Sequence, residues 1–217
     1  YTGLATGFAT GALARGVINV DAQLNHIATR MKMTGEQADD LKQKLYDASN
    51  NEAIRMDVSQ LVDGMTQVLA LTGDLDFAVA NIENIGIAAR SSGSAASDIA
   101  NVVANLKKLD INTPEQVALA LETLIAQGDA GAVEFKDLAA EFGPLASAMA
   151  ALGQRGMGAV KFLGGFMQTT QDTTGSVAET GTAISAFLRD ISAKGAFLEK
   201  NGITVFDGDQ MREADAI

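Results

Sequence analysis

The single histidine and one adjacent pair of acidic residues are the first candidates for chemistry in this chain of 217 residues. His26 could serve as the base for a serine nucleophile, but no Gly-x-Ser-x-Gly elbow accompanies it. Its position at the edge of a helical pattern favours a surface or interface residue. Asp39 and Asp40 are neighbours on a predicted helix, where successive side chains point about 100° apart. The pair is therefore not expected to converge on one metal ion or proton.

Two glycine-containing motifs also resemble sites of known chemistry. Asp207-Gly208-Asp209 matches the beginning of a calcium-binding loop, but the later glutamate and the flanking helices of such a loop are missing. We interpret it as a turn. Gly153, Gly156 and Gly158 surround Arg155, but they follow a predicted helix rather than a strand. That order excludes both a dinucleotide-binding fingerprint and a P-loop.

The remaining candidates have a sufficient structural explanation. Glu134 and Asp137 stand at the start of a predicted helix, where acidic side chains stabilise the positive end of the dipole. The methionines are expected to provide adaptable packing, and they would also suit a surface that fits several neighbours. This interpretation covers seven of the eight methionines, namely Met31, Met33, Met56, Met65, Met149, Met157 and Met167. We therefore expect no catalytic residue, no cofactor and no metal site, and we expect that the protein is not an enzyme.

Composition restricts the class of protein further. The chain is 47% hydrophobic and 20% charged, as in ordinary globular proteins, but only 5% aromatic, so its core must be aliphatic and rich in alanine. A net charge of −11 disfavours binding to nucleic acid. The chain contains no cysteine, which excludes disulfides and thiolate metal sites and is compatible with a reducing cytoplasm. Because the first residue is Tyr1, we expect a piece of a longer chain.

Residues 1–20 form a Gly/Ala-rich lead-in, expected to be a loosely packed helix or a flexible segment. Gly3, Gly7 and Gly11 make a stripe of small residues like those of helices that associate in membranes. Arg15 interrupts the apolar run too early for it to span a bilayer, which needs about 20 residues. The run also lacks the features of a signal peptide. A membrane-active segment is the alternative interpretation for these residues only.

Residues 21–200 have the periodicity of a helical core domain. The clearest helix is predicted over Asp57–Thr72, where apolar residues recur every three or four positions, and Gly73 is expected to end it. Further helices are predicted before it, around 21–33 and from a capping box at Thr34, and after it, from Leu75 to the loop at 91–94. Thr113-Pro114 is a strong helix start.

The stretch Glu134–Gly158 is predicted to contain two short helices, because proline at Gly143-Pro144 should break the helix. Gly128 is expected to stop the helix that begins after Thr113. Gly164-Gly165 is expected to loosen the helix that follows Gly158, and a loop at Asp172–Gly175 precedes the last helix, which carries the stripe from Val177 to Ile191.

Residues 201–217 are predicted to form a β-hairpin-like end and tail. Asn201-Gly202 and Asp207-Gly208 are turn sequences, and Ile203–Phe206 between them is β-branched and aromatic. The predicted fold class is therefore all-α: an array of short antiparallel helices, arranged as helical hairpins, with a short C-terminal β-hairpin.

The helical pattern repeats along the chain at a fixed distance, which is the distance in sequence from Leu71 to Leu152. We call this distance the repeat offset. Other pairs of apolar positions match at this offset, among them Ile85 with Phe166, and Val103 with Ile184. An internal duplication of a helix–turn–helix unit explains the pattern. Chance similarity between Ala-rich amphipathic helices is the alternative.

Over roughly residues 20–210 the chain resembles the core region of phage tail tape measure proteins. The resemblance is carried by the order of degenerate motifs: Thr34-Gly35 with Leu41–Leu45, the acid-led helix starts at Asp57–Leu61 and Glu134–Leu138, the proline-containing segment Phe142–Gly153, and Gly202–Asp207. The chain departs from the family at Asp207–Arg212, where the glycine of the turn comes early, so the register of the hairpin is open.

The resemblance implies a structural protein of the virion that sets tail length during assembly and occupies the lumen of the tail tube until ejection. The partners it implies are tail tube subunits, tail assembly chaperones and baseplate or tail-tip proteins, with self-association possible. It places the protein in the phage tail and, during assembly, in the host cytoplasm. The alternatives are a non-catalytic bacterial helical interaction module and a tail-associated cell-wall hydrolase fragment, for which the sequence offers no paired acid and partner.

Overall fold

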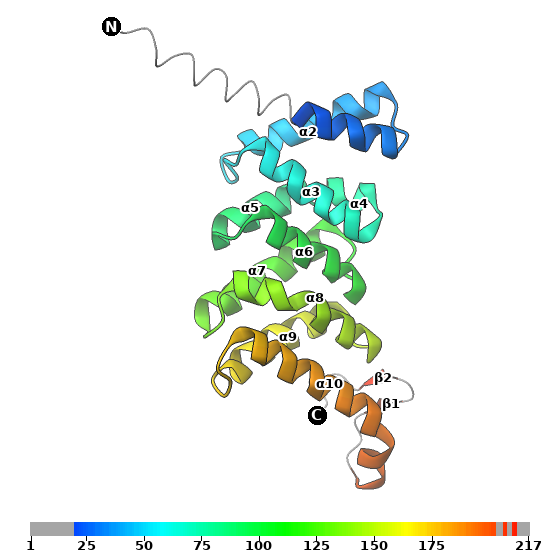
Figure 1. Ribbon diagram of the computed structural model, residues 1–217, viewed down its shortest axis with the longest axis vertical. Coiled ribbons are helices and arrows are strands. Elements are labelled where there is room, and N and C mark those ends of the chain that lie inside the picture. The colour runs from blue at the N-terminus through cyan, green and yellow to red at the C-terminus, as the bar shows by residue number, and fades with distance from the viewer. Residues whose placement is uncertain (1–19, 203–205, 208–209, 212–217) are drawn as a thin grey trace, which may run out of the picture.

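The computed structural model describes residues 20–202, 206–207 and 210–211, and most of them are helical (Figure 1). The predicted all-α class is confirmed. After the helical residues 20–30 the elements are α2 (Gly35–Asn50), α3 (Val58–Thr72), α4 (Leu75–Ala80), α5 (Ile82–Ser92), α6 (Ala96–Leu106), the 3₁₀ turn η1 (Lys107–Leu109), α7 (Pro114–Ala130), α8 (Phe135–Ala151), α9 (Gly156–Gln171) and α10 (Val177–Lys200).

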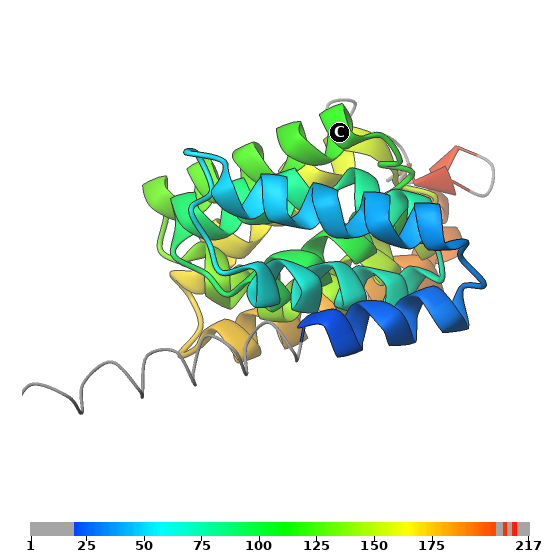
Figure 2. The ribbon, with the colours of Figure 1, turned by 90° about the horizontal axis from the view of Figure 1, so that it is seen from above.

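The helices stack in hairpin units along the long axis of the molecule (Figure 1). A hairpin unit is here a helix of one layer followed by a helix of the other: residues 20–30 with α2, α3 with α4–α5, α6 with α7, and α8 with α9. In the first layer α3 packs on α6, α6 on α8, and α8 on α10. In the second layer α2 packs on α5, α5 on α7, and α7 on α9. The view along the stack shows the two layers (Figure 2). This is the arrangement of an α-solenoid.

The hairpin units recur at nearly constant spacing in the sequence. The first-layer helices α3, α6, α8 and α10 begin at Val58, Ala96, Phe135 and Val177. Successive starts are about 40 residues apart, which is within the range of helical solenoid repeats. The repeat offset seen in the sequence is therefore the length of two units, because it also separates the start of α6 from the start of α10. The stack is therefore built from single hairpin units, and the segment that repeats in the sequence contains two of them.

The predicted helix caps are confirmed. Thr34 Oγ1 accepts from the backbone N–H of Gln37 at 3.3 Å, and Gln37 Oε1 accepts from the N–H of Thr34 at 2.9 Å. Thr113 and Gln116 form the same capping box at the start of α7. At the end of α3, Gly73 adopts φ 68°, the left-handed conformation that glycine accepts without a steric penalty.

The predicted break at Pro144 is wrong, because α8 is continuous from Phe135 to Ala151. Gly143 before the proline has no Cβ to clash with the pyrrolidine ring, and its carbonyl accepts from Ser147 Oγ at 2.8 Å. The helix packs between α6 and α10, burying Phe142 and Leu145 beside the proline. Burial of these side chains offsets the roughly 3 kcal/mol that an interior proline costs a helix.

The predicted stop at Gly128 is also wrong. α7 does not stop at Gly128 but continues to Ala130, and Gly128 is buried in its interior. A Cβ at Gly128 would lie 2.9 Å from the backbone nitrogen of Phe135, so this glycine allows α7 to approach the start of α8. The helix predicted after Gly158 is confirmed as α9, which is continuous through Gly164-Gly165. In both helices glycine serves close packing rather than termination.

The helix predicted from Leu75 is divided in two at Asn81, a division for which the amphipathic pattern gave no signal. The Asn81 side chain is fully buried and donates from Nδ2 to the carbonyl of Phe77 at 2.8 Å. Its Oδ1 accepts from Nδ2 of Asn84 at 3.0 Å, and the same Asn84 nitrogen lies 2.8 Å from the carbonyl oxygen of Pro114. The junction between α4 and α5 is thereby tied to the start of α7.

The two ends of the chain are described in part. Residue 20 is helical and buried, and residues 1–19 of the predicted lead-in lie outside the described residues. Asn201-Gly202 forms the predicted turn. β1 (Phe206–Asp207) pairs antiparallel with β2 (Gln210–Met211), with Asp207 opposite Gln210. The rest of the predicted hairpin and tail lies outside the described residues, so the hairpin as a whole stays a prediction.

Two glycine-to-alanine substitutions test the packing of α7 on α8. Gly128→Ala places a methyl group against backbone and should lower the free energy of unfolding by about 1–3 kcal/mol. Gly158→Ala in α9, where a Cβ meets nothing within 4 Å, should raise it by up to about 1 kcal/mol. Urea unfolding followed by circular dichroism measures both. Equal effects of the two substitutions would contradict the close approach at Gly128.

Candidate functional site

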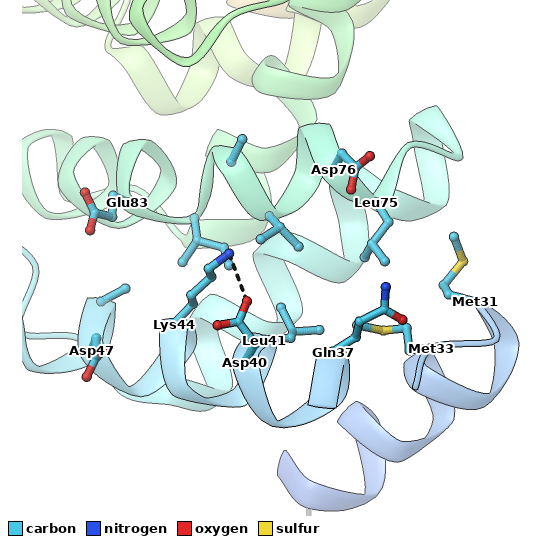
Figure 3. A pocket seen from close by; sticks show the side chains of 14 residues that line it. Met31, Met33, Gln37, Asp40, Leu41, Lys44, Asp47, Leu75, Asp76 and Glu83 are labelled. Carbon is cyan, nitrogen blue, oxygen red and sulfur yellow. Dashed lines mark ion pairs between the residues drawn. The ribbon is translucent and has the colours of Figure 1, made fainter. Parts of the chain in front are cut away.

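A groove of about 700 Å³ lies between α2 and the α4–α5 pair (Figure 3). It is created where the first hairpin unit meets the second. Its apolar lining comes from both sides and consists of Leu41, Leu75, Val79 and Ile82, with Met31 and Met33 at one end. Acidic residues accompany this lining, namely Asp40, Asp47, Asp76 and Glu83.

Lys44 is the one cationic residue in the lining of this groove. Its Nζ lies 3.2 Å from Oδ2 of Asp40, one turn earlier on α2, as the dashed line in Figure 3 shows. The other acidic residues of the lining therefore leave a net negative charge around an apolar centre. Among the described residues no group of three His, Cys, Asp or Glu side chains is placed to hold a metal ion. The groove offers apolar contact and negative charge.

His26 lies in a second groove, of about 570 Å³, between the helical residues 20–30 and α3. Asp63 and Ser97 line the same groove. The sequence did not predict this proximity, because the three residues are far apart along the chain. His26 is exposed and forms no hydrogen bond or ion pair with either of them, and Asp63 Oδ1 instead accepts from Nε2 of Gln23 at 3.3 Å. The three groups share a groove without the hydrogen bonds of a nucleophile–base pair.

The adjacent carboxylates of α2 point to different places. Asp40 lines the groove of Figure 3, whereas Asp39 lines a separate hollow beside Asp21 and Lys42. Lys42 Nζ lies 2.7 Å from Asp21 Oδ1 and so joins the two helices of the first hairpin unit. The hydrogen bond to Asp21 raises the pKa of the Lys42 ammonium. These charges hold helices together and converge on no common ligand.

The glycine-rich segment around Arg155 is a structural turn between α8 and α9. Gly153 and Gly156 adopt φ values of 77° and 68°, which favour glycine. Arg155 Nη1 donates to the carbonyl of Lys108 at 3.0 Å, and its Nε lies 3.3 Å from Oδ2 of Asp110. The arginine therefore fixes this turn to the segment that follows α6.

The seven methionines between residues 31 and 167 serve packing, as expected. Met65, Met149 and Met167 are buried in the core. Four others are partly buried against it, namely Met31, Met33, Met56 and Met157. Two of these four, Met31 and Met33, line the groove of Figure 3, so adaptable side chains stand where the apolar lining reaches the surface.

The acidic candidates near helix and strand ends occupy structural positions. Glu134 is the N-cap residue of α8, makes no side-chain capping bond, and lies 3.6 Å from Lys136 Nζ. Asp137 stands in the first turn of the same helix. Asp207 is paired in β1, and residues 208–209 of the suspected calcium loop lie outside the described residues.

Asp74 directly precedes Leu75, which lines the groove. It caps α4 by accepting from the N–H of Phe77 at 2.9 Å, and it forms an ion pair with Lys107 of η1. The Lys107 ammonium stands 4.9 Å above the ring centroid of Phe77. The hydrogen bond from Lys107 and then that from the backbone N–H of Phe77 lower the pKa of Asp74. The three residues join α4 to the following hairpin unit.

Removal of the Asp74 carboxylate should weaken the fold in a pH-dependent way. Because the folded pKa is lowered, the ion pair stabilises the fold fully above the ordinary Asp pKa of about 3.9, and this contribution is lost as pH falls through the folded pKa. Asp74→Asn keeps a capping side chain and should cost less than about 1 kcal/mol at pH 7, since the pair is partly exposed. The cost should disappear in strong acid.

Urea unfolding of the variant and the parent chain at several pH values between 7 and 2 measures this difference. Lys107→Gln, which removes the other partner, should show the same dependence. A difference that is constant with pH would contradict the assignment of the ion pair.

Two further observations concern membrane-spanning helices and similarity to known proteins. None of the helices in the described part of the chain is long and apolar enough to cross a membrane. A scan of protein-family models, a search of curated proteins and a search of solved structures found no match to this chain. The function of the chain is therefore inferred from its own residues and from the motifs that resemble the tape measure core.

Proposed function

We propose that this chain is a structural segment of a phage or prophage tail tape measure protein. The observation that carries the proposal is the spacing of the hairpin units, whose first helices begin at the nearly even positions Val58, Ala96, Phe135 and Val177. In such a stack each unit contacts only its neighbours, so the length of the assembly grows in proportion to the number of units. Proportionality between chain length and physical length is what a molecular ruler requires.

The sequence and the surface support the same proposal. The motifs that resemble the tape measure core fall on the starts of α2, α3 and α8 and on the proline-containing part of α8. The net charge of −11 discourages binding to nucleic acid before ejection. On this proposal the chain lies in the lumen of the tail tube, contacts tube subunits, tail assembly chaperones and tail-tip proteins, and is built by duplication of one hairpin.

A non-catalytic interaction module is the second candidate. The groove of Figure 3 favours it, because an apolar lining with Met31 and Met33 at one end and acidic side chains along it suits a helix with an apolar stripe and flanking positive charges. A cell-wall hydrolase fragment is the weaker alternative, since His26 has no bonded partner in its groove. Loss of turbidity on mixing the protein with peptidoglycan would support the hydrolase.

The proposal predicts that tail length follows the number of hairpin units. Deletion of Ala96–Glu134, which is one unit from the start of α6 to the residue before α8, should shorten the tails of the phage that encodes this chain. The loss is about 10 Å if the chain measures as a folded stack, from the spacing of packed helices. It is about 60 Å if the chain measures as one extended helix, from the rise of about 1.5 Å per residue.

Electron microscopy of purified tails measures this change. Tandem duplication of the same segment, Ala96–Glu134, is the reciprocal variant and should lengthen the tails by the same amount. The substitution Thr123→Ala, at a partly buried position of α7, keeps the number of units and should leave the length unchanged. Tails of parental length from both the deletion and the duplication would contradict the proposal.

A further inference from the structure

The groove of Figure 3 lies inside the stack, between the first and the second hairpin unit, and described helices form both of its walls. One wall is divided at Asn81, whose φ of −105° and ψ of 10° depart from helical values and change the direction of the chain. After this division α5 packs on α2, whereas the main contacts of α4, before it, are with α3. The opening between α2 and α4 therefore comes from the packing of two complete units.

The floor of the groove is apolar and about three helical turns long. Its lining on α2 extends from Gln37 to Ala48 at intervals of three or four residues, a length of about 16 Å at 1.5 Å per residue. Opposite it, Leu75 and Val79 stand one turn apart on α4 and are only partly buried against the core. A surface of this length and shape accepts the apolar stripe of one α-helix.

Acidic side chains stand on both walls of the groove. Asp40 and Asp47 lie about two turns apart on α2, and Asp76 and Glu83 are separated by the same distance in sequence on the α4–α5 pair (Figure 3). All four are exposed, and within the described residues only Asp40 has an ion pair, with Lys44. Four acidic residues and one lysine give the lining a net charge of −3.

These properties restrict what the groove can bind. Negative charge on its walls disfavours nucleic acid and the anionic headgroups of a membrane surface. No group of three His, Cys, Asp or Glu side chains in the described part of the chain is placed to hold a metal ion. The groove instead matches an apolar stripe that carries positive charge on both of its sides.

Charge argues against the rest of this chain, and against a second copy of it, as the occupant. Residues 1–19 contain a single charged residue, Arg15, and residues 203–217 contain four acidic residues and one arginine. A second copy has a net charge of −11 and is repelled from a groove that is itself negative. The occupant that fits is a basic segment of a different molecule.

We propose that the groove between α2 and α4–α5 binds a basic amphipathic α-helix of another protein. The apolar stripe of that helix lies on Leu75 and Val79 of one wall and on the buried Leu41 at the floor. Lysine or arginine side chains on its two flanks pair with Asp47 on one wall and with Glu83 on the other. This inference does not depend on the tape measure proposal, because its failure would leave the relation between tail length and the number of units untouched.

Fluorescence anisotropy with the whole chain and labelled synthetic peptides tests the proposal. The first peptide has about 14 residues, enough to cover the groove as a helix, with leucine at every third or fourth position and lysine on both flanks. Its dissociation constant should lie between about 1 and 100 μM, as for a small interface. Replacing its lysines by glutamate, or its leucines by serine, should weaken binding at least about tenfold. Absence of binding, or equal binding of either altered peptide, would overturn the proposal.

Two triple variants separate the groove from a general attraction to an acidic protein. The groove variant removes the three acidic residues of the lining that have no ion pair within the described residues, by Asp47→Asn, Asp76→Asn and Glu83→Gln. The control variant removes three exposed acidic residues of α7, by Glu115→Gln, Glu122→Gln and Asp129→Asn. Both variants have the same net charge, and circular dichroism confirms that each is folded.

The groove variant should raise the dissociation constant of the lysine peptide about tenfold, because each exposed ion pair contributes a small part of the affinity. The control variant should change it by less than about threefold, since salt screens charges away from the groove. Equal effects of the two variants would show attraction without a site and would overturn the proposal.

Two other results would assign the groove to a different occupant and so overturn the proposal. A synthetic peptide of residues 1–19 that binds the whole chain more tightly than the lysine peptide would identify the chain's own lead-in. Self-association of the chain between about 1 and 100 μM in sedimentation equilibrium, abolished in the groove variant, would identify a second copy. A monomer that binds the lysine peptide and not the peptide of residues 1–19 supports the proposal.

Discussion

The burial of α6 between its neighbours is the contact on which the rest of the stack depends. Seven of its eleven residues are buried, including Ile99, Val102, Val103 and Leu106. α3 and α8 cover it within its own layer, and α5 and α7 cover it from the other layer. A single helical hairpin cannot bury apolar residues that face in so many directions, so each unit requires one before it and one after it. That requirement explains why helices of similar length recur at similar spacing.

Small residues determine how closely these units approach. A Cβ at Gly86 would lie 2.7 Å from Cγ2 of Ile54, and one at Gly64 would lie 3.1 Å from Cγ2 of Ile85. With aromatic residues at only 5% of the chain, the core gains its stability from many small contacts between backbones and aliphatic side chains. Stability is thereby distributed over successive interfaces.

Local signals in the sequence were sufficient for the helix class and for many helix ends, because capping is a property of a few neighbouring residues. Thr34, Thr113 and Gly73 behave as their types predict. Pro144 and Gly128 do not, because packing against neighbouring helices outweighs their local preference. The groove between α2 and α4–α5, and the groove that His26 and Ser97 both line, depend on which helices become neighbours in space. Amphipathic periodicity gives no information about that.

Amide hydrogen exchange on the chain carrying Leu45→Ala tests most directly whether the units are joined only to their neighbours. Leu45 is completely buried in α2, at the first end of the stack, and its truncation should cost about 2–5 kcal/mol locally. The stack predicts that protection falls in α2 and α3 and is retained in α8 and α9. An equal loss of protection in all of these helices would show a single cooperative core and would contradict the account.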